Sequence, residues 1–163
     1  MNPNVWIDQQ GFSHTTEEMV FLLLPKTTGI VVLEGVTNCG KTQLLRRFRK
    51  ASPTAVCIYS YIDVVKELIH ICEKSGQGTT LERFVSLLES FPCLAIEDID
   101  YIRGPNTQSF LSSAINEAAK TCLIIVTGNY VNYLMPDFLE QLDNPMHFKA
   151  YALIRREEHD YSV

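Results

Sequence analysis

The sequence predicts an α/β fold in which a parallel sheet of about five strands is covered by helices on both faces. Short apolar stretches rich in β-branched residues alternate with segments whose apolar residues recur at helical spacing. Consecutive apolar stretches are not joined by tight-turn signals, so hairpins are not expected. Three of the four clear strands also end in polar, loop-forming residues, and ligands of such sheets collect at the carboxyl ends of the strands.

In chain order, the first predicted element is a helix that begins after Thr15 and is stopped by Pro25. Thr15 and Glu18 have the spacing of a capping box, which marks the start of a helix. The continuous aliphatic run Ile30–Leu33 has the pattern of a strand that is buried on both faces. A loop follows, and then a helix from Lys41 to about Lys50.

The middle of the chain is expected to hold two further strands with two helices between them. Ala55–Tyr59 is the second strand, and Asp63–Lys74 shows apolar residues at helical spacing. A second helix, 79–90, opens with another capping box. Cys93–Ile96 is the third strand.

The last third of the chain repeats the alternation. A turn at Gly104–Asn106 precedes a helix over Thr107–Lys120, and Cys122–Val126 is the fourth strand. Pro136 opens a short helix that reaches Leu142. Met146–Ile154 is expected to form a fifth strand.

The bulk composition fits one domain of 163 residues, long enough to bury a core without disulfides or metal ions. We expect an N-terminal helix and lead-in over 1–28, the core of the domain over 29–154, and a tail over 155–163. The five cysteines include no CxxC pair, and three of them lie in apolar runs. Thiols in such surroundings behave as small apolar groups, which favours a reducing, cytoplasmic location.

The charge and hydropathy patterns argue against a membrane protein and against a free-standing nucleic-acid binder. No apolar run approaches the roughly 18 residues of a membrane-spanning helix, and the amino terminus lacks the layout of a secretory signal. The net charge is −5, whereas DNA-binding domains usually carry a basic face. The one basic cluster lies on the predicted helix after the loop and is interpreted as a solvated face; it consists of Arg46, Arg47, Arg49 and Lys50. Contact with DNA is therefore expected to be weak or indirect.

The clearest motif matches the phosphate-loop pattern GxxxxGK[ST] in full; it consists of Gly35, Val36, Thr37, Asn38, Cys39, Gly40, Lys41 and Thr42. Its glycines let successive amide groups point inward at phosphate oxygens, and the helix that begins there adds its positive end. Lys41 is expected to reach the outer phosphates, and the Thr42 hydroxyl to bind Mg²⁺. Cys39 is expected to contribute its amide; a redox role of its thiol is the alternative. The motif predicts binding of a nucleoside triphosphate with Mg²⁺.

Two carboxylates, Glu97 and Asp98, follow the third predicted strand. One acid near the loop can bind Mg²⁺ through its water shell, and its neighbour can polarise the water that attacks the γ-phosphate. Adjacent residues of a strand point to opposite sides, so the two acids are given different parts. We assign Glu97 to the metal ion and Asp98 to the water. A solvated strand end is the alternative.

Asn129 is a further candidate because of the order expected for the strands. A complete strand and two helices separate the loop from the acids, which leaves room in the sheet for another strand between them. The polar-ended strand Cys122–Val126 suits that place. Asn129 would then lie near the γ-phosphate and could sense it or orient water; a plain turn at Gly128–Asn129 is the alternative.

From about Gly29 to Tyr133 the chain resembles the AAA+ ATPase core of the bacterial replication initiator DnaA and its relatives, including Hda and DnaC-type helicase loaders. The resemblance rests on the Walker A motif just described, on the strand and helix over Ala55–Ile71, and on Leu94–Tyr101 as Walker B. It also rests on Gly104–Asn129, which is similar to the run into the sensor 1 motif. It implies a three-layer, AAA+-like P-loop NTPase fold that binds ATP, with Asn129 as sensor 1. It also implies self-association or a protein partner under the control of ATP and ADP.

The chain departs from this family in its arginines. The family carries an arginine finger after sensor 1, but Asp137–Lys149 contains no arginine, and Arg155 and Arg156 are assigned to a solvated tail. Neither a helical lid with a sensor 2 arginine nor a helix-turn-helix domain is expected in this sequence. An arginine finger contributes roughly 10³ or more to the rate, so any ATP hydrolysis is expected to be weak.

Three functions agree with these features. The first is an AAA+-like nucleotide switch or weak ATPase in DNA replication or its regulation. The second is a non-catalytic module that binds a nucleotide and a partner, and it predicts binding without turnover. The third is a small-molecule kinase, which would need arginines over the phosphates and an acceptor pocket. The sequence leaves open whether ATP is hydrolysed.

Overall fold

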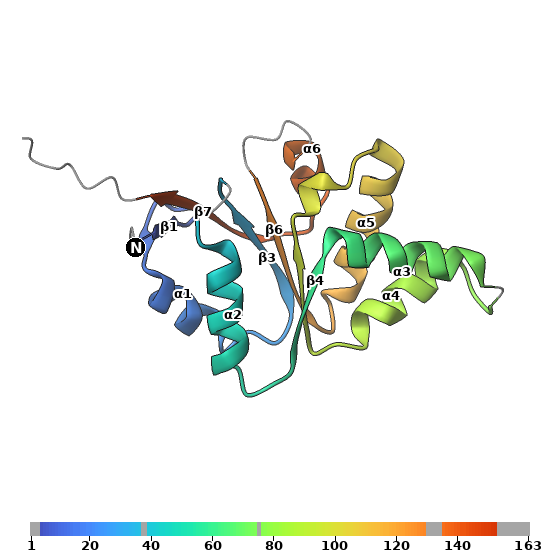
Figure 1. Cartoon of the computed structure of the whole chain (residues 1–163), viewed down its shortest axis with the longest axis horizontal. Coiled ribbons are helices and arrows are strands. Elements are labelled where there is room, and N and C mark those ends of the chain that lie inside the picture. Colours follow the sequence, from blue (N-terminus) through green and yellow to red (C-terminus); the bar gives the residue numbers. More distant parts are fainter. Residues whose placement is uncertain (1–3, 37–38, 75, 130–134, 153–163) are drawn as a thin grey trace, which may run out of the picture.

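The computed structural model describes residues 4–36, 39–74, 76–129 and 135–152 of the chain. A seven-stranded sheet in the order β2-β1-β7-β3-β6-β5-β4 forms its centre, with helices on both faces (Figure 1). The strands are β1 (Asn4–Ile7), β2 (Ser13–His14), β3 (Gly29–Glu34), β4 (Val56–Ser60), β5 (Cys93–Glu97), β6 (Leu123–Gly128) and β7 (Met146–Ala152). The helices are α1 (Thr16–Leu23), α2 (Lys41–Ala51), α3 (Tyr61–Glu73), α4 (Thr80–Glu89), the 3₁₀ turn η1 (Ile99–Tyr101), α5 (Pro105–Ala118) and α6 (Met135–Glu140).

Five adjacent strands of the sheet, from β7 to β4, run parallel to one another, as the sequence predicted. β6 lies between β3 and β5, in the place predicted for the strand that ends near Asn129. Its register pairs Thr127 with Leu33 of β3 and Val126 with Ile96 of β5. The carboxyl ends of β3, β6 and β5 therefore meet at one edge of the sheet.

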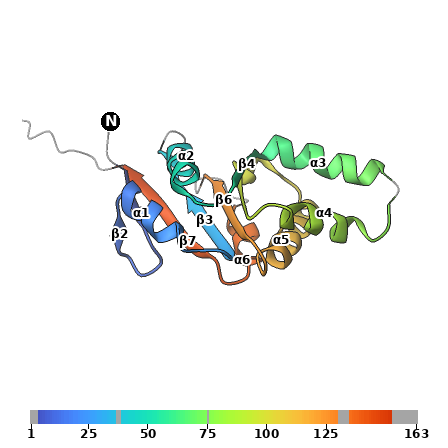
Figure 2. The same ribbon diagram turned by 90° about the horizontal axis from the view of Figure 1, so that it is seen from below.

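The central strands are buried on both faces, and alternate residues feed two separate cores. In β3, Val31 and Leu33 pack with residues of α1 and α2, whereas Ile30 and Val32 pack with residues of α3, α4 and α5. Figures 1 and 2 show these two groups of helices around the sheet. This arrangement explains why β3 is a continuous apolar run without polar alternation.

The amino-terminal segment contains two strands that the sequence did not predict. β1 pairs antiparallel with both β2 and β7, and the fully buried Trp6 lies opposite Ala150 of β7. The expected helix of this segment is present as α1. The two short strands extend the sheet from the predicted five strands to seven.

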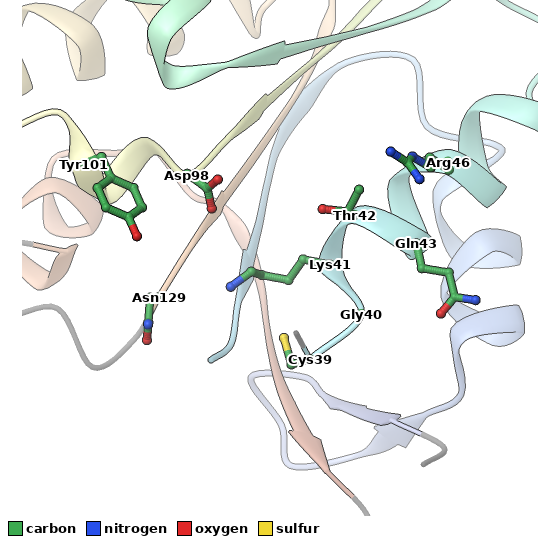
Figure 3. A pocket seen from close by; sticks show the side chains of 9 residues that line it. All are labelled: Cys39, Gly40, Lys41, Thr42, Gln43, Arg46, Asp98, Tyr101 and Asn129. Carbon is green, nitrogen blue, oxygen red and sulfur yellow. The ribbon is translucent and has the colours of Figure 1, made fainter. Parts of the chain in front are cut away.

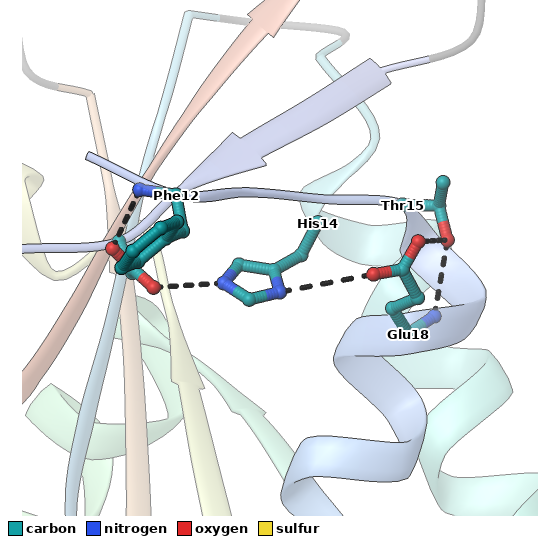
Figure 4. A network of polar contacts seen from close by, with 5 residues as sticks. Phe12, His14, Thr15 and Glu18 are labelled. Carbon is teal, nitrogen blue, oxygen red and sulfur yellow. Dashed lines mark hydrogen bonds and ion pairs between the residues drawn. The ribbon is translucent and has the colours of Figure 1, made fainter. Parts of the chain in front are cut away.

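A polar network holds the β1–β2 turn against α1 (Figure 4). Asp8 accepts a 2.9 Å hydrogen bond from the amide of Phe12, and its Oδ2 lies 2.8 Å from Nε2 of His14. The His14 hydrogen bond is the main reason why the pKa of the Asp8 carboxyl is below its usual value. Nδ1 of His14 lies 3.9 Å from Glu18 of α1, so the network links the turn to that helix.

The predicted helix starts are largely confirmed. The capping box at Thr79 and Glu82 is complete, with reciprocal contacts of 3.1 and 3.4 Å. Thr15 caps α1 by accepting the amide of Glu18, but the Glu18 carboxylate contacts the Thr15 hydroxyl instead of its backbone amide. α3 begins at Tyr61, two residues earlier than predicted, because Ser60 and Asp63 form a capping box of their own.

The structure contains no disulfide, since none of the five cysteines is bonded to another. Burial raises the pKa of Cys93 to about 12 and that of Cys122 to about 11, so both are neutral, inert groups in the core.

Among the described helices, none is long and apolar enough to cross a membrane. The predicted tail at 155–163 and the end of the predicted fifth strand lie outside the described residues.

Candidate functional site

A cavity of about 580 Å³ opens at the edge where β3, β6 and β5 end (Figure 3). Its lining comes from the loop after β3, from α2, and from the segments that follow β5 and β6. The lining residues are Cys39, Gly40, Lys41, Thr42, Gln43, Arg46, Asp98, Tyr101 and Asn129. Segments that are far apart in the sequence thus meet in one pocket, at the place where parallel α/β sheets bind ligands.

The loop after β3 is folded tightly against the end of β6. The amide of Gly35 donates a 3.0 Å hydrogen bond to the carbonyl of Gly128, and Gly40 adopts a left-handed conformation (φ 99°) at the start of α2. A Cβ atom on Gly35 would lie 2.3 Å from Sγ of Cys39, so a side chain does not fit there. Val36 lies within the described loop, while Thr37 and Asn38 lie outside the described residues.

Lys41 is buried at the first position of α2, with its side chain directed into the pocket. Its Nζ donates to the carbonyl oxygens of Gly35, Gly128 (3.3 Å) and Val36 (3.5 Å). These carbonyl groups are neutral, so they do not cancel the positive charge of the ammonium group. The amine therefore provides a positive point at the mouth of the loop, as expected for a group that receives phosphate oxygens.

Thr42 and Glu97 join α2 to the end of β5. The Thr42 hydroxyl donates a 2.7 Å hydrogen bond to Oε1 of Glu97. A hydroxyl and a carboxylate are oxygen ligands of the kind that Mg²⁺ prefers, and both lie beside the positive start of α2. The two side chains thus fit a magnesium ion bound next to the loop, and their proximity supports the metal role predicted for Glu97.

Asp98 enters the pocket by a different route from the one predicted. β5 ends at Glu97, and Asp98 has a left-handed backbone (φ 59°). The chain therefore turns sharply at Asp98, and the direction of its side chain is set by this turn and not by the alternation of side chains along a strand. The amide of Asp98 donates to the Thr127 hydroxyl of β6 over 3.2 Å. Burial, followed by the nearby charges of Glu97 and Asp100, raises the pKa of the Asp98 carboxyl.

Asn129 directly follows β6 and lines the same pocket as Lys41 and Asp98. A side-chain amide there offers both a donor and an acceptor. The structure thus brings Asp98 and Asn129 to the same pocket as four residues of the predicted loop, namely Cys39, Gly40, Lys41 and Thr42. Glu97 lies at the edge of this group, in contact with Thr42.

The sequence did not identify three of the lining residues. Gln43 and Arg46 belong to the exposed side of α2, and Arg46 follows Thr42 by four residues, the spacing that places two side chains on one face of a helix. That spacing was a usable signal, although Arg46 was interpreted as part of a solvated face. Tyr101 reaches the pocket through the turn η1, for which the sequence contains no clear signal.

The sequence also did not identify a contact between a carboxylate and an imidazole ring beside the loop. Oε1 of Glu34, the last residue of β3, lies 2.6 Å from Nε2 of His147 on β7. The two atoms are close but not aligned as a hydrogen bond, and the contact is an ion pair only when His147 is protonated. It holds the residue before Gly35 in place, outside the lining of the pocket.

Comparison with known proteins supports the fold through solved structures. No protein-family model matches the sequence, and no curated protein matches it. A DNA replication initiation factor superposes with a TM-score of 0.56 at 19% identity, over 79% of this chain and 44% of that chain. The DnaC helicase loader gives 0.53 at 18% identity, over 76% of each chain. DnaA from Aquifex aeolicus bound to AMPPCP gives 0.53 at 19% identity, over 78% of this chain and 40% of that one.

The chain therefore has the fold of these replication initiators and of the helicase loader, and this agrees with the α/β fold class that the sequence predicted. It spans less than half the length of the two initiator chains and about three quarters of the loader. At such low identities the likeness concerns the fold.

Proposed function

We propose that this chain binds ATP with Mg²⁺ in the pocket at the end of the sheet, and that it acts as a cytoplasmic, AAA+-like nucleotide switch or weak ATPase in DNA replication or its regulation. One observation carries the proposal. A buried ammonium group, a hydroxyl, a carboxylate and an amide come from three separate segments and line one cavity; they belong to Lys41, Thr42, Asp98 and Asn129. A second carboxylate, that of Glu97, contacts the Thr42 hydroxyl at the edge of this group. The AMPPCP-bound state of the similar DnaA structure supports a triphosphate as the ligand.

In this proposal each group has its own part. Lys41 would exchange its carbonyl partners for oxygens of the outer phosphates, while the positive start of α2 faces the same anion. Thr42 and Glu97 would hold Mg²⁺, which would neutralise charge on the phosphates when bound. Asp98 would accept a hydrogen bond from the attacking water, and its raised pKa makes its carboxylate a better base than an ordinary one. Asn129 would orient that water or contact the terminal phosphate.

Slow turnover is part of the proposal. Among the described residues that line the pocket, the cations are Lys41 and Arg46, and both belong to α2. The wall formed by the ends of β5 and β6 offers a carboxylate and neutral groups in its described part. Since an arginine at the terminal phosphate is worth roughly 10³ to 10⁵ in rate, efficient hydrolysis would depend on a partner or on a second copy of the chain.

The same observation keeps a second candidate open, a non-catalytic module that binds a nucleotide and a protein partner. The two functions share the pocket and differ in turnover. The small-molecule kinase lacks comparable support, because the described wall opposite α2 has no cation to close over transferred phosphate. In all cases contact with DNA is expected to be weak or to pass through a partner, since the chain has a net charge of −5.

Two measurements on the purified chain test the proposal. Calorimetric titration with ATP, ADP and GTP, each with Mg²⁺ or with a chelator, should show binding of ATP that Mg²⁺ strengthens. A phosphate-release assay should then show slow turnover for the weak ATPase and none for the module. If neither ATP nor ADP binds at millimolar concentration, the pocket is not a nucleotide-binding site and the proposal is wrong.

A further inference from the structure

Tyr101 lies on the wall of the pocket opposite α2 and is fixed to the acid pair. It is the last residue of η1, the turn that directly follows Asp98, and its amide donates a 3.0 Å hydrogen bond to the carbonyl of Asp98. Its position therefore depends on the same short turn that brings the Asp98 carboxylate into the pocket.

The aromatic ring of Tyr101 is held by a second tyrosine. It stacks on Tyr61, with ring centroids 5.0 Å apart and an angle of 21° between the ring planes. Tyr61 is the first residue of α3 and follows β4, whose end is paired with the end of β5 through Ser60 and Glu97. The two rings thus grow from neighbouring strand ends. This stack restricts the ring although 54% of the Tyr101 surface is exposed.

The hydroxyl of Tyr101 points into the pocket. Figure 3 shows it directed toward the space between the Lys41 amine and Asn129. Within the described part of the chain, no hydrogen bond engages this hydroxyl. A phenol is a neutral donor and can donate to a phosphate oxygen without adding charge to the wall.

The charges around the pocket suggest what the Tyr101 hydroxyl does when a ligand binds. The proposed triphosphate would lie with its inner phosphates at the start of α2, and its last phosphate would extend past Lys41 toward Asp98. The Asp98 carboxylate repels that phosphate, and the described cations of the pocket all lie on α2. A neutral donor beside Asp98 would offset part of this repulsion at the terminal phosphate.

We propose that the Tyr101 hydroxyl donates a hydrogen bond to an oxygen of the terminal phosphate and makes the site prefer a nucleoside triphosphate to a diphosphate. The inference rests on the proposed function, because it concerns the same pocket and the same ligand. It adds a residue that reads the length of the phosphate chain. A switch of this kind would distinguish ATP from ADP without an arginine in the described wall.

The variant Tyr101→Phe tests the proposal because it keeps the stack on Tyr61 and removes only the hydroxyl. Tyr61→Phe is the matched control, since its hydroxyl does not belong to the described lining of the pocket. Dissociation constants for AMPPCP and for ADP, both with Mg²⁺, are measured by calorimetry for the three proteins. Circular dichroism melts show that each variant is folded.

We expect Tyr101→Phe to weaken AMPPCP by about tenfold, the effect of one hydrogen bond to a charged group, and to leave ADP within about twofold. Tyr61→Phe should change neither constant. An unchanged ratio of the two constants in Tyr101→Phe would overturn the inference, whether both ligands weaken equally or neither does. If the unmodified chain binds neither nucleotide, the proposed function fails, and this outcome is distinct from the first.

Discussion

The Thr42 hydroxyl donates a 2.7 Å hydrogen bond to Oε1 of Glu97, and this contact joins two segments that lie 55 residues apart. It spans from the first turn of α2 to the end of β5, although β6 separates β5 from the loop strand in the sheet. The contact thus brings the end of the loop next to the acid pair without any ligand.

Replacing Lys41 by alanine should abolish measurable binding of ATP. Its amine contacts only carbonyl oxygens among the described residues, so a phosphate is the charged partner that its position suits. We expect a loss of about 100-fold or more in affinity, measured by calorimetry, with little change in the circular dichroism spectrum. Lys50→Ala, an exposed residue of the same helix, is the control and should bind as before. Undiminished affinity in Lys41→Ala would exclude the loop as the phosphate site.

Glu97→Gln should uncouple ATP binding from Mg²⁺. The glutamine amide oxygen can still accept the hydrogen bond of Thr42, but it lacks the charge that attracts a divalent cation. We expect affinity for ATP to fall about tenfold with Mg²⁺ present and to stay constant in a chelator. Glu89→Gln removes an exposed charge at the end of α4 and serves as the control. A loss of equal size under both conditions would contradict the metal role.

Asp98→Asn should keep ATP bound and stop the hydrolysis that the unmodified chain shows. Asparagine tolerates the left-handed backbone at this position, so the turn into η1 is expected to persist. An amide cannot take up a proton from water, and phosphate release should fall by about 100-fold or more. In the unmodified chain the rate should also fall with acid at a pH above the ordinary carboxyl value, because the pKa of Asp98 is raised. An unaltered rate in the variant would remove Asp98 from the chemistry.

The raised pKa of Asp98 also predicts an effect on stability that needs no ligand. In the window above the ordinary pKa of 3.8, the folded chain holds this proton more firmly than the unfolded chain does. The contribution of Asp98 to stability therefore decreases as the pH rises through that window. Asp98→Asn, which cannot ionise, should have a higher Tm than the unmodified chain at pH 7, and the difference should shrink at pH 4. A lower Tm at pH 7 would show that the charged form is stabilised in the fold.

Gly35→Ala should distort the loop through a specific contact, and a second substitution should partly relieve it. The new Cβ atom would lie 2.3 Å from Sγ of Cys39 and 3.0 Å from Cβ of Ala150. We expect ATP affinity to fall by about tenfold or more in Gly35→Ala. Cys39→Ala alone should bind normally, and the double variant should recover part of the loss because only the Sγ contact is removed. Calorimetry on the four proteins forms a complete cycle; additive effects would show that the thiol is not the obstacle.

Sequence patterns predicted the parallel part of the sheet because its inner strands β3, β6 and β5 contain continuous apolar runs. They also predicted the order of the strands around the site. The length of chain between the loop and the acids left room for an intervening strand, and β6 occupies that place. The predicted start of a helix at Lys41 is confirmed, and both Lys41 and Thr42 line the pocket, whereas their binding of phosphate and Mg²⁺ stays a prediction.

The features that sequence patterns missed depend on contacts between distant segments. β1 has four residues and β2 has two, and β1 is stabilised by β7, about 140 residues away, so neither shows a strand pattern by itself. The left-handed backbone of Asp98 depends on how η1 packs beyond the end of β5. Tyr101 reaches the pocket because of this same turn and because of its stack on Tyr61. Periodicity carries no information on such contacts.

The hydrogen bond from Lys41 to the Gly128 carbonyl would link ligand binding to the main chain of β6. A phosphate that recruits the ammonium group takes it from Gly128, the final residue of β6, whose carbonyl oxygen then keeps the amide of Gly35 as its donor. Binding and release of the ligand would thus change the hydrogen bonds of the main chain immediately before Asn129. A partner docked where the polypeptide leaves the sheet could read the state of the pocket without touching the nucleotide.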